Sequence, residues 1–358
     1  MSDVRLQKME YVVVTHRNQE VILCKFPYDP NLLSLFRKEF PSAKWSRTFT
    51  SWYLPNSTLY RKRLRLELPE IGDQIIPKLY NYNREQFILY RNALTQRKFS
   101  DATLKTYLNE FAQLLIILKQ HPVDQLTPER LNSYFLYCIK KLNHSENQVY
   151  SRMNAIKTYF KLVLHKEAIF ETVIRPKATK SLPKILSKQE IKRLFETTTN
   201  LKHLLILKMA YGMGLRVSEL IELKVSDLFS ERNQVHIRNS KGKKDRYVNL
   251  PESLKGLLED YLRAYQPKNF LFEGQFQEQY TTRSAQSIFK NAMNKAKISR
   301  SVGIHGLRHS YATHLLDAGT DMIFIQKLLG HSNIKTTEVY AKISNKVLSN
   351  VQSPLDTF

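Results

Sequence analysis

The chain has 358 residues, and 42% of them are hydrophobic, which suits two or three compact domains and excludes wholesale disorder. Fifty-six Lys and Arg residues against 32 Asp and Glu residues leave a formal net charge of +24. Residues 1–80, 81–180 and 181–358 each carry a basic excess, so no single tail explains the total. This distribution favours a nucleic acid as the partner. A membrane surface would require a basic amphipathic anchor, which the sequence does not show.

The two cysteines, Cys24 and Cys138, are too few to cross-link a chain of this length and match no metal-ligand spacing. We therefore expect a protein of the reducing cytoplasm. The nucleic-acid partner expected from the charge would associate it with the nucleoid. Residues 1–9 contain no signal-peptide core, and the longest aliphatic run, Leu114–Leu118, is too short to cross a bilayer. No membrane partner is expected.

Residues 1–80 predict a small α+β module. The apolar runs of Glu10–Phe26 indicate a hairpin, Asn31–Phe40 a short helix, and Ser46–Leu54 a β-rich segment. A basic cluster that contains Arg61 and Arg63 follows two tryptophans. DNA contact by this cluster and a solvated basic edge of a small core are equally open.

Residues 81–172 predict a helical bundle, because apolar residues recur there at steps of three and four. Thr127 and Pro128 begin one helix, and Ser145 with Gln148 forms a capping box for the next. Basic residues lie on the predicted surface of that last helix, and both a solvated face and DNA contact are open for them: Arg152, Lys157 and Lys161.

Residues 173–183 predict a basic, extended linker, and residues 184–358 a mixed α/β domain. In the latter, Ser187 with Glu190 forms another capping box, and a buried helix is expected at Leu201–Tyr211. Two strands are expected around a basic turn that contains Lys241, Lys243 and Lys244. The whole chain is thus expected to be mainly α with small β elements, including one β-hairpin in the last domain.

Several polar residues interrupt the apolar helices of this last domain. Arg216 follows a glycine turn where a helix should begin, and Glu219 lies one turn further on. Taken alone, this pair is typical of an ordinary helix ion pair. Lys241 at a hairpin tip is, alone, typical of a solvated lysine.

Two further segments carry polar residues at informative spacings. His305 and Arg308 share a helix face and can converge on one anion. A helix is expected to end at Gly330, with His331 after the turn. Tyr340 follows nine residues later and, taken alone, would be a packing residue.

The order and spacing of these residues together resemble the active-site set of the tyrosine recombinase (phage integrase) family. The matching positions are Arg216, Lys241, His305, Arg308, His331 and Tyr340, and the flanking words Gly-Leu-Arg-Val-Ser-Glu-Leu and Leu-Leu-Gly-His-Ser match as well. The resemblance is close over residues 184–344, is nearest to the Xer-type branch, and extends more loosely over residues 80–172, which resemble the family's core-binding domain.

The resemblance implies DNA cleavage by Tyr340 through a 3′-phosphotyrosyl link, with Arg216 and Arg308 on the phosphate. Lys241 would be the general acid, and His305 would be the acid/base partner and a hydrogen-bond donor to the phosphate. His331 would be a further hydrogen-bond donor, and Glu219 would orient the site. These residue types suit the chemistry, because two guanidiniums bind phosphate oxygens with a fixed geometry that lysine cannot provide.

The resemblance also implies double-stranded DNA at specific recombination sites as the partner, a homotetramer in the synaptic complex, and possible accessory DNA-bending proteins. No cofactor or metal is expected, because the arginines can stabilise the phosphate charge themselves. A type IB topoisomerase and a catalytically silent DNA-binding factor are the competing activities. The extra N-terminal module favours integration or excision of a mobile element over Xer-type dimer resolution.

The C-terminal tail is the last feature of the sequence. Residues 345–358 contain Val347, Leu348 and Val351 at helical spacing, and so short an apolar helix needs a groove to cover its face. Packing on its own domain and docking on a neighbouring protomer are both open, and the resemblance favours docking.

Overall fold

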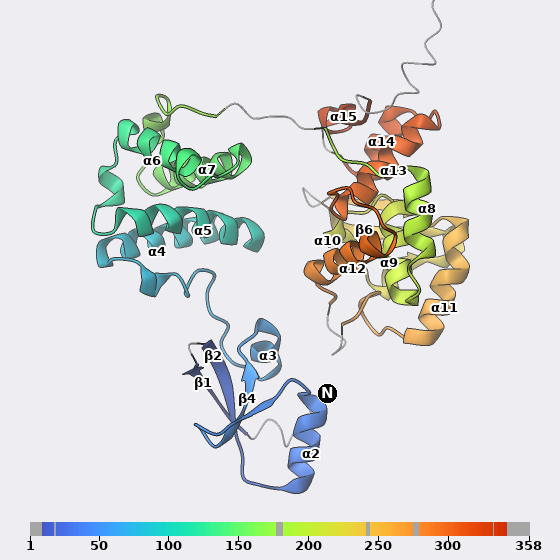
Figure 1. The fold of residues 1–358 in the computed structure, drawn as a ribbon, viewed down its shortest axis with the longest axis horizontal. Helices are drawn as coiled ribbons and strands as arrows, with labels where there is room; N and C mark the ends of the chain where they lie inside the picture. Colours follow the sequence, from blue (N-terminus) through green and yellow to red (C-terminus); the bar gives the residue numbers. More distant parts are fainter. Residues whose placement is uncertain are drawn as a thin grey trace, which may run out of the picture. The chain divides into compact units, whose positions relative to one another are not determined.

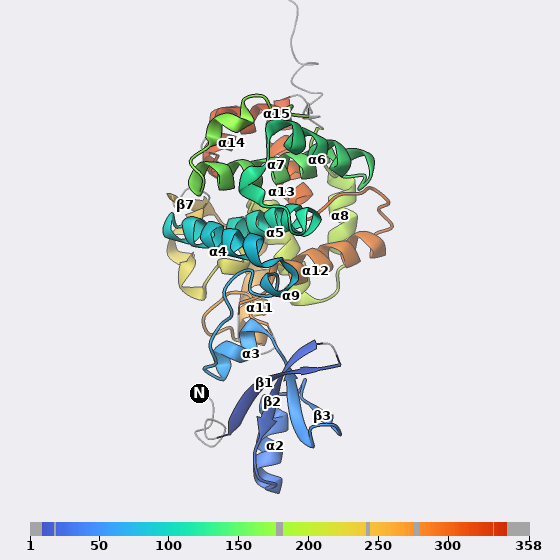
Figure 2. The ribbon, with the colours of Figure 1, turned by 90° about the vertical axis from the view of Figure 1, so that its left-hand side faces the viewer.

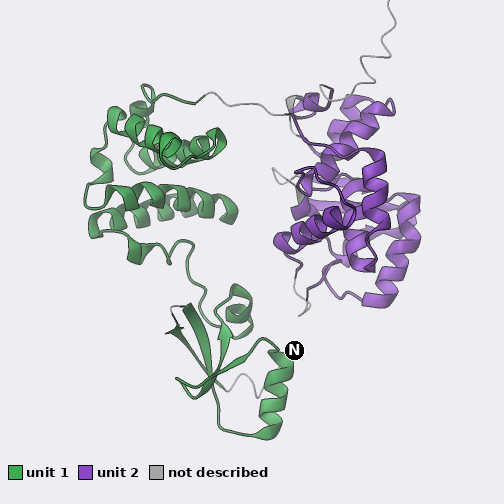
Figure 3. Ribbon diagram, viewed as in Figure 1, with its two compact units in different colours: residues 1–179 green, residues 180–358 purple. Residues whose placement is uncertain are grey.

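The computed structural model describes residues 9–17, 19–176, 182–240, 244–274, 279–331 and 333–341. The chain divides into two compact units, residues 1–179 and 180–358, and this boundary falls within the predicted linker (Figure 3). Both units are mainly helical and each has one small antiparallel sheet, which confirms the predicted fold class (Figure 1). Within the described ranges, no helix is both long and apolar enough to cross a bilayer.

The N-terminal module is a four-stranded antiparallel sheet with a helix on one face (Figure 2). Its strands have the order β1-β2-β4-β3, and its first helix is α2 (Pro30–Glu39). Phe36 of that helix is fully buried against the sheet. The predicted hairpin and helix are confirmed. The strands are β1 (Glu10–His16), β2 (Gln19–Lys25), β3 (Lys44–Ser46) and β4 (Ser51–Pro55).

A second helix of this module, α3 (Thr58–Arg63), was not predicted from the sequence. The side chain of Ser57 accepts a hydrogen bond from the Tyr60 backbone N–H and so caps the helix. Tyr60 is buried and packs edge-on against Phe40. The sequence gives little sign of this helix, because Tyr60 is its one buried residue and most of its other side chains are basic.

The predicted helical bundle is confirmed and has four helices around one core. Thr127 caps its third helix by accepting from the Arg130 backbone N–H. Ser145 and Gln148 form the capping box expected for the fourth. The helices are α4 (Asn81–Gln96), α5 (Asp101–Leu118), α6 (Pro128–Lys140) and α7 (Glu146–Leu162).

The bundle core begins upstream of the predicted boundary at residue 80. Ile75 and Leu79 are buried in the core of the bundle, not in that of the N-terminal module. Arg91 of α4 forms ion pairs with Asp73 and Glu70 at 2.6 and 2.5 Å. The segment before α4 is therefore part of the bundle in its packing.

The C-terminal unit has one large core, lined by most of its helices and by the inner face of its sheet. Ser187 and Glu190 form the predicted capping box of the first helix. The helices are α8 (Lys188–Glu196), α9 (Leu201–Gly212), α10 (Val217–Glu222), α11 (Lys255–Tyr265), α12 (Thr282–Lys295), α13 (His305–Asp317), α14 (Met322–Leu329) and α15 (Glu338–Ala341).

The three-stranded sheet of this unit consists of β5 (Leu228–Phe229), β6 (Gln234–Ser240) and β7 (Lys244–Asn249). The pairing of β6 with β7 confirms the predicted hairpin, whereas the two-residue strand β5 was not predicted. A separate small cluster of buried residues lies between α13, α14 and α15, and it contains Tyr340. This cluster, the start of α10 and strand β7 carry the residues of the candidate site.

The packing of residues 70–79 predicts different effects for two N-terminal truncations. Deletion of residues 1–68 should leave the bundle intact, whereas deletion of residues 1–80 removes Ile75 and Leu79 from its core. Each of these side chains contributes about 1.5–3 kcal/mol by burial, so the longer deletion should lower the melting temperature of the bundle by about 10 °C or more. Calorimetry of the two truncated proteins tests this, and equal melting temperatures would contradict it.

Candidate active site

Arg216 and Glu219 are held together at the start of α10. Arg216 is the N-cap of this helix, and its backbone N–H donates to a carboxylate oxygen of Glu219 at 2.9 Å. Its guanidinium also donates to Glu219, at 2.6 Å. The ion pair expected from the sequence is present, and Glu219 is only 5% exposed, which makes it a buried charge and not a surface pair.

A second arginine, Arg246 of β7, binds the same carboxylate. Its two terminal nitrogens donate to the two oxygens of Glu219 at 2.9 and 2.8 Å. The sequence reasoning did not single out Arg246. The only signal was its place in the word Ser-Lys-Gly-Lys-Lys-Asp-Arg, whose last residue it is.

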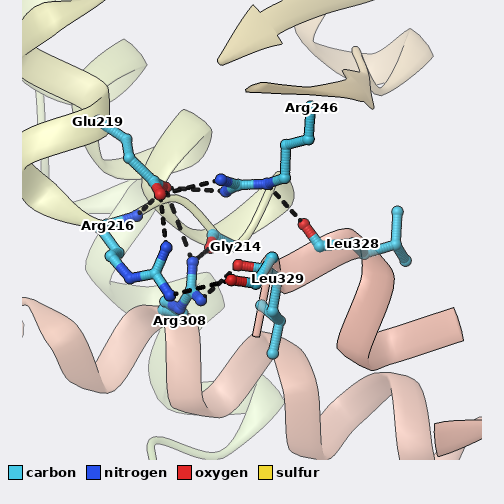
Figure 4. A network of polar contacts seen from close by, with 8 residues as sticks. Gly214, Arg216, Glu219, Arg246, Arg308, Leu328 and Leu329 are labelled. Atoms are coloured by element: carbon cyan, nitrogen blue, oxygen red, sulfur yellow. Dashed lines mark hydrogen bonds and ion pairs between the residues drawn. The ribbon is translucent and has the colours of Figure 1, made fainter. Parts of the chain in front are cut away.

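The third arginine, Arg308 of α13, lies in the interior beside them and is 4% exposed. One of its terminal nitrogens donates to the Gly214 carbonyl at 2.7 Å and lies 3.7 Å from a Glu219 oxygen. The other donates to the Leu329 carbonyl at 2.7 Å. Figure 4 shows the three guanidiniums grouped around the one carboxylate.

The end of α14 supplies one backbone carbonyl to each arginine. Leu328 accepts from Arg246 at 3.0 Å, Leu329 from Arg308, and Gly330 from Arg216 at 3.5 Å. These carbonyls lie at the negative end of the helix dipole and have no partner within the helix. The helix ends there because Gly330 adopts a φ of 64°, as the sequence predicted.

These charges fix the ionisation of the buried groups. Burial by itself raises the pKa of Glu219, but the hydrogen bonds and charge of Arg246, together with Arg216, outweigh it and lower this pKa to about 2. Burial and the charge of Arg216 lower the pKa of Arg308 to about 10. Both groups are therefore charged at neutral pH, and the site has an excess of positive charge.

The two predicted histidines border this cluster. His305 is the first residue of α13 and is exposed, and burial of its ring edge with the charges of Arg308 and Arg216 lowers its pKa. His331 follows Gly330, and its Nδ1 lies 3.0 Å from the Thr337 hydroxyl. Burial and the arginine charges lower the pKa of His331 to about 4. Neither ring is held in the protonated form at neutral pH.

Tyr340 of α15 is 2% exposed and packs in the small cluster between α13, α14 and α15. Its ring stacks on that of His331 with centroids 6.3 Å apart. Its hydroxyl lies 3.1 Å from Nδ1 of His309, a residue that the sequence reasoning did not single out. Burial raises the pKa of Tyr340, while Arg308 and Arg216 oppose this rise.

The structure thus brings five of the predicted residues together with Glu219: Arg216, His305, Arg308, His331 and Tyr340. Lys241 and Lys243 lie outside the described residues, as does the predicted C-terminal tail beyond Ala341. Lys244 begins β7, and its side chain is outside the description. In the described part of the chain, no cluster of three or more His, Cys, Asp or Glu residues could hold a metal ion.

The predicted basic face of α7 needs one correction. Arg152 is not on the helix surface but 5% exposed, and its Nε donates to Glu110 at 2.7 Å. It lies on the side of α7 that faces the bundle core, so its placement among the surface residues was wrong. Lys157 and Lys161 both form ion pairs with Glu167, at 3.2 and 2.8 Å. DNA contact by these two lysines stays a prediction.

The arginines of the basic cluster in the N-terminal module also form contacts within the module. Arg61 donates to the side chain of Asn56 and to the Glu67 carbonyl, both at 2.6 Å. Arg63 forms an ion pair with Glu39 and lies over the ring of Phe40. Both arginines are half-buried, and DNA contact by them likewise stays a prediction.

Two segments of the chain match known family profiles. Residues 184–346 match the profile of the phage integrase family, and residues 87–169 match that of the phage integrase N-terminal SAM-like domain. The two matches cover the C-terminal unit and the helical bundle.

Individual relatives are similar over most of their length. The chain is 35% identical to a putative integrase/recombinase of Sinorhizobium fredii, over 73% of this chain and 85% of the relative. It is 37% identical to the tyrosine recombinase XerA of Pyrococcus horikoshii, over 60% and 75% respectively. A crystal structure of a lambda integrase dimer bound to a core site has the same fold, with a TM-score of 0.62, 15% identity, and coverage of 95% and 96%.

The chain therefore belongs to the phage integrase family of tyrosine recombinases, as its residue pattern indicated. It is a site-specific recombinase by class, and the alternative of a catalytically silent DNA-binding factor is not supported.

The lowered pKa of His331 predicts a pH dependence of stability. The folded protein keeps this ring neutral down to about pH 4, whereas in the unfolded chain the ring binds a proton near the ordinary histidine pKa of 6.5. As the pH falls, the unfolded state binds this proton before the folded state does. The contribution of the neutral His331 ring to the free energy of unfolding is therefore complete above pH 6.5 and is lost as the pH falls toward 4. In His331→Gln the free energy of unfolding should depend less on pH in this window. Parallel curves for the two proteins, measured by denaturant unfolding, would contradict this.

Proposed function

We propose that this protein cleaves and rejoins double-stranded DNA at specific recombination sites through a 3′-phosphotyrosyl intermediate. The observation that carries the proposal is the grouping of two phosphate-binding candidates, Arg216 and Arg308, beside a tyrosine and two histidines. A type IB topoisomerase would use similar chemistry, but the relatives named recombinase favour recombination.

In the proposed cleavage step, the Tyr340 oxygen attacks the scissile phosphorus, and the bond from phosphorus to the 5′-oxygen breaks. Arg216 and Arg308 bind the non-bridging oxygens, where negative charge increases in the transition state. Lys241 donates a proton to the departing 5′-oxygen. In the rejoining step, the 5′-hydroxyl of a strand cut in the partner duplex attacks the phosphotyrosine and releases the tyrosine.

The two histidines would assist in different roles. A neutral His331 that accepts from the Thr337 hydroxyl at Nδ1 carries its proton on Nε2, which can then donate to the phosphate. His305, exposed at the first turn of α13, is the acid/base partner. Its lowered pKa favours the neutral form, which can accept a proton and return it.

The biological role that we infer is integration or excision of a mobile element, with Xer-type dimer resolution as the alternative. The additional module before the bundle supports the first role, because a second DNA-binding module allows contact with outlying arm sites. The relatives include both an integrase/recombinase and XerA, and so support both roles. Assembly as a homotetramer on two duplexes, with accessory DNA-bending proteins, belongs to the same proposal.

The nucleophile can be tested with a suicide duplex. A binding site is first selected from random-sequence DNA by the full-length protein, and duplexes nicked near its centre are then offered as substrates. Tyr340→Phe should abolish the covalent complex and leave DNA binding nearly unchanged, because it removes one oxygen and a hydrogen bond worth about 0.5–1.5 kcal/mol.

The matched control for this variant is Tyr311→Phe, which removes a hydroxyl from a half-buried tyrosine of α13. It should still form the covalent complex at the rate of the wild type. A covalent complex in the Tyr340→Phe protein would show that another residue is the nucleophile.

The phosphate clamp can be tested with Arg216→Lys. Lysine keeps the charge but loses the planar fork, so the cleavage rate should fall by about 10²–10³-fold, as for loss of one transition-state donor. DNA affinity should fall much less, because binding depends on many other basic residues. Single-turnover cleavage and mobility-shift titrations measure the two effects, and equal losses would instead identify a general DNA-binding arginine.

A further inference from the structure

Arg246 is absent from the predicted active-site set, yet it makes the most complete set of contacts in the cluster. Its guanidinium forms a bidentate ion pair with Glu219, and its Nε donates to the Leu328 carbonyl. Its side chain is 10% exposed, so solvent does not compete strongly for these bonds. Every nitrogen of the guanidinium therefore has a partner in the protein.

The side chain of Arg246 also packs closely against Gly330, in the turn that precedes His331. A Cβ atom added to Gly330 would lie 3.1 Å from Cδ of Arg246 and 3.2 Å from one of its terminal nitrogens. A side chain at this position would therefore displace the arginine as well as strain the left-handed backbone. Arg246 thus joins three segments: strand β7, the carboxylate of α10, and the end of α14.

Arg246 also affects the charge balance of the cluster. Glu219 pairs with all three of Arg216, Arg308 and Arg246. Without Arg246, its full charge would be shared by Arg216 and Arg308 alone. Those are the residues to which the proposed function gives the phosphate, so Glu219 would then compete with the phosphate for them.

We propose that Arg246 is a positioning residue of the recombination reaction. It neutralises Glu219, which leaves the charge of Arg216 and Arg308 available to the scissile phosphate, and it anchors the strand that begins three residues after Lys241. This inference rests on the proposed function. Lysine cannot replace Arg246, because a point charge cannot bind both carboxylate oxygens and a backbone carbonyl in one plane.

The test uses the full-length protein and the selected suicide duplex described above, with single-turnover cleavage at saturating DNA. Arg246→Gln should slow cleavage by about 10–100-fold, as is typical when a group that orients a catalytic residue is lost. The dissociation constant for DNA should change less than about threefold, because Arg246 itself is buried. Arg246→Lys should also be slowed, by a smaller factor.

The deciding variant is the double substitution Arg246→Gln with Glu219→Gln. It removes one positive and one negative charge together, and the glutamine amide oxygen at position 219 can still accept a hydrogen bond from Arg216. The clamp therefore regains its net charge while Arg216 keeps an acceptor, and cleavage should recover about tenfold relative to Arg246→Gln. A purely structural role predicts the opposite, since the double variant loses more hydrogen bonds. A double variant that is no faster than Arg246→Gln would overturn the inference.

A matched control lies in the same hairpin. Arg238 of β6 pairs with Asp227, a carboxylate as buried as Glu219 but outside the cluster. Arg238→Gln should lower the melting temperature, though by less than Arg246→Gln because the Arg238 side chain is 48% exposed, and should leave the cleavage rate within about threefold of the wild type. Equal slowing in both variants would overturn the inference, because it would assign the effect to stability.

The outcomes separate the inference from the function on which it rests. If the wild type forms no covalent complex with any selected duplex, the proposed function fails. If the wild type cleaves and Arg246→Gln cleaves within threefold of it, only the inference fails. If Arg246→Gln does not fold, the comparison is made between Arg246→Lys and Arg246→Lys with Glu219→Gln, and recovery in the latter is again required.

Discussion

The buried carboxylate of Glu219 is the interaction on which the candidate site depends. A charge that is 5% exposed is stable only when it is paired and hydrogen-bonded, and removal of a partner from such a pair typically costs about 3–5 kcal/mol. Here the partners come from the start of α10, from β7 and from α13. The carboxylate therefore fixes three segments that are distant in the sequence, and it orients the arginines that would bind phosphate.

The ends of two helices complete this arrangement. The Gly214 carbonyl lies just beyond α9, and those of Leu328 and Leu329 lie in the last turn of α14. Gly214 has a φ of 59°, and a Cβ there would come within 2.5 Å of the Tyr311 ring, so only glycine permits this approach. Carbonyls left unpaired at helix ends thus serve as acceptors for guanidiniums, and the site needs few additional polar side chains.

Sequence reasoning succeeded where the signal is local. The capping boxes at Ser145 and Ser187 and the glycine at the end of α14 fixed helix ends that the structure confirms. It failed where a charge meets a partner distant in the chain. The buried pairing of Arg152 with Glu110 and the fork of Arg246 on Glu219 depend on tertiary packing, which periodicity and composition do not contain. The helix α3 was missed because its apolar face is too small.

The state of Tyr340 follows from the same packing. A phenol that is 2% exposed, with a pKa raised by burial, is protonated and a poor nucleophile. Its buried neighbours are few: Ala312, Ile325 and Leu329. This cluster is much smaller than the main core of the unit, so opening it would expose less apolar surface than opening that core. The charges that favour the ionised tyrosine come from the arginine cluster, because Arg308 and Arg216 oppose the rise in the Tyr340 pKa that burial causes.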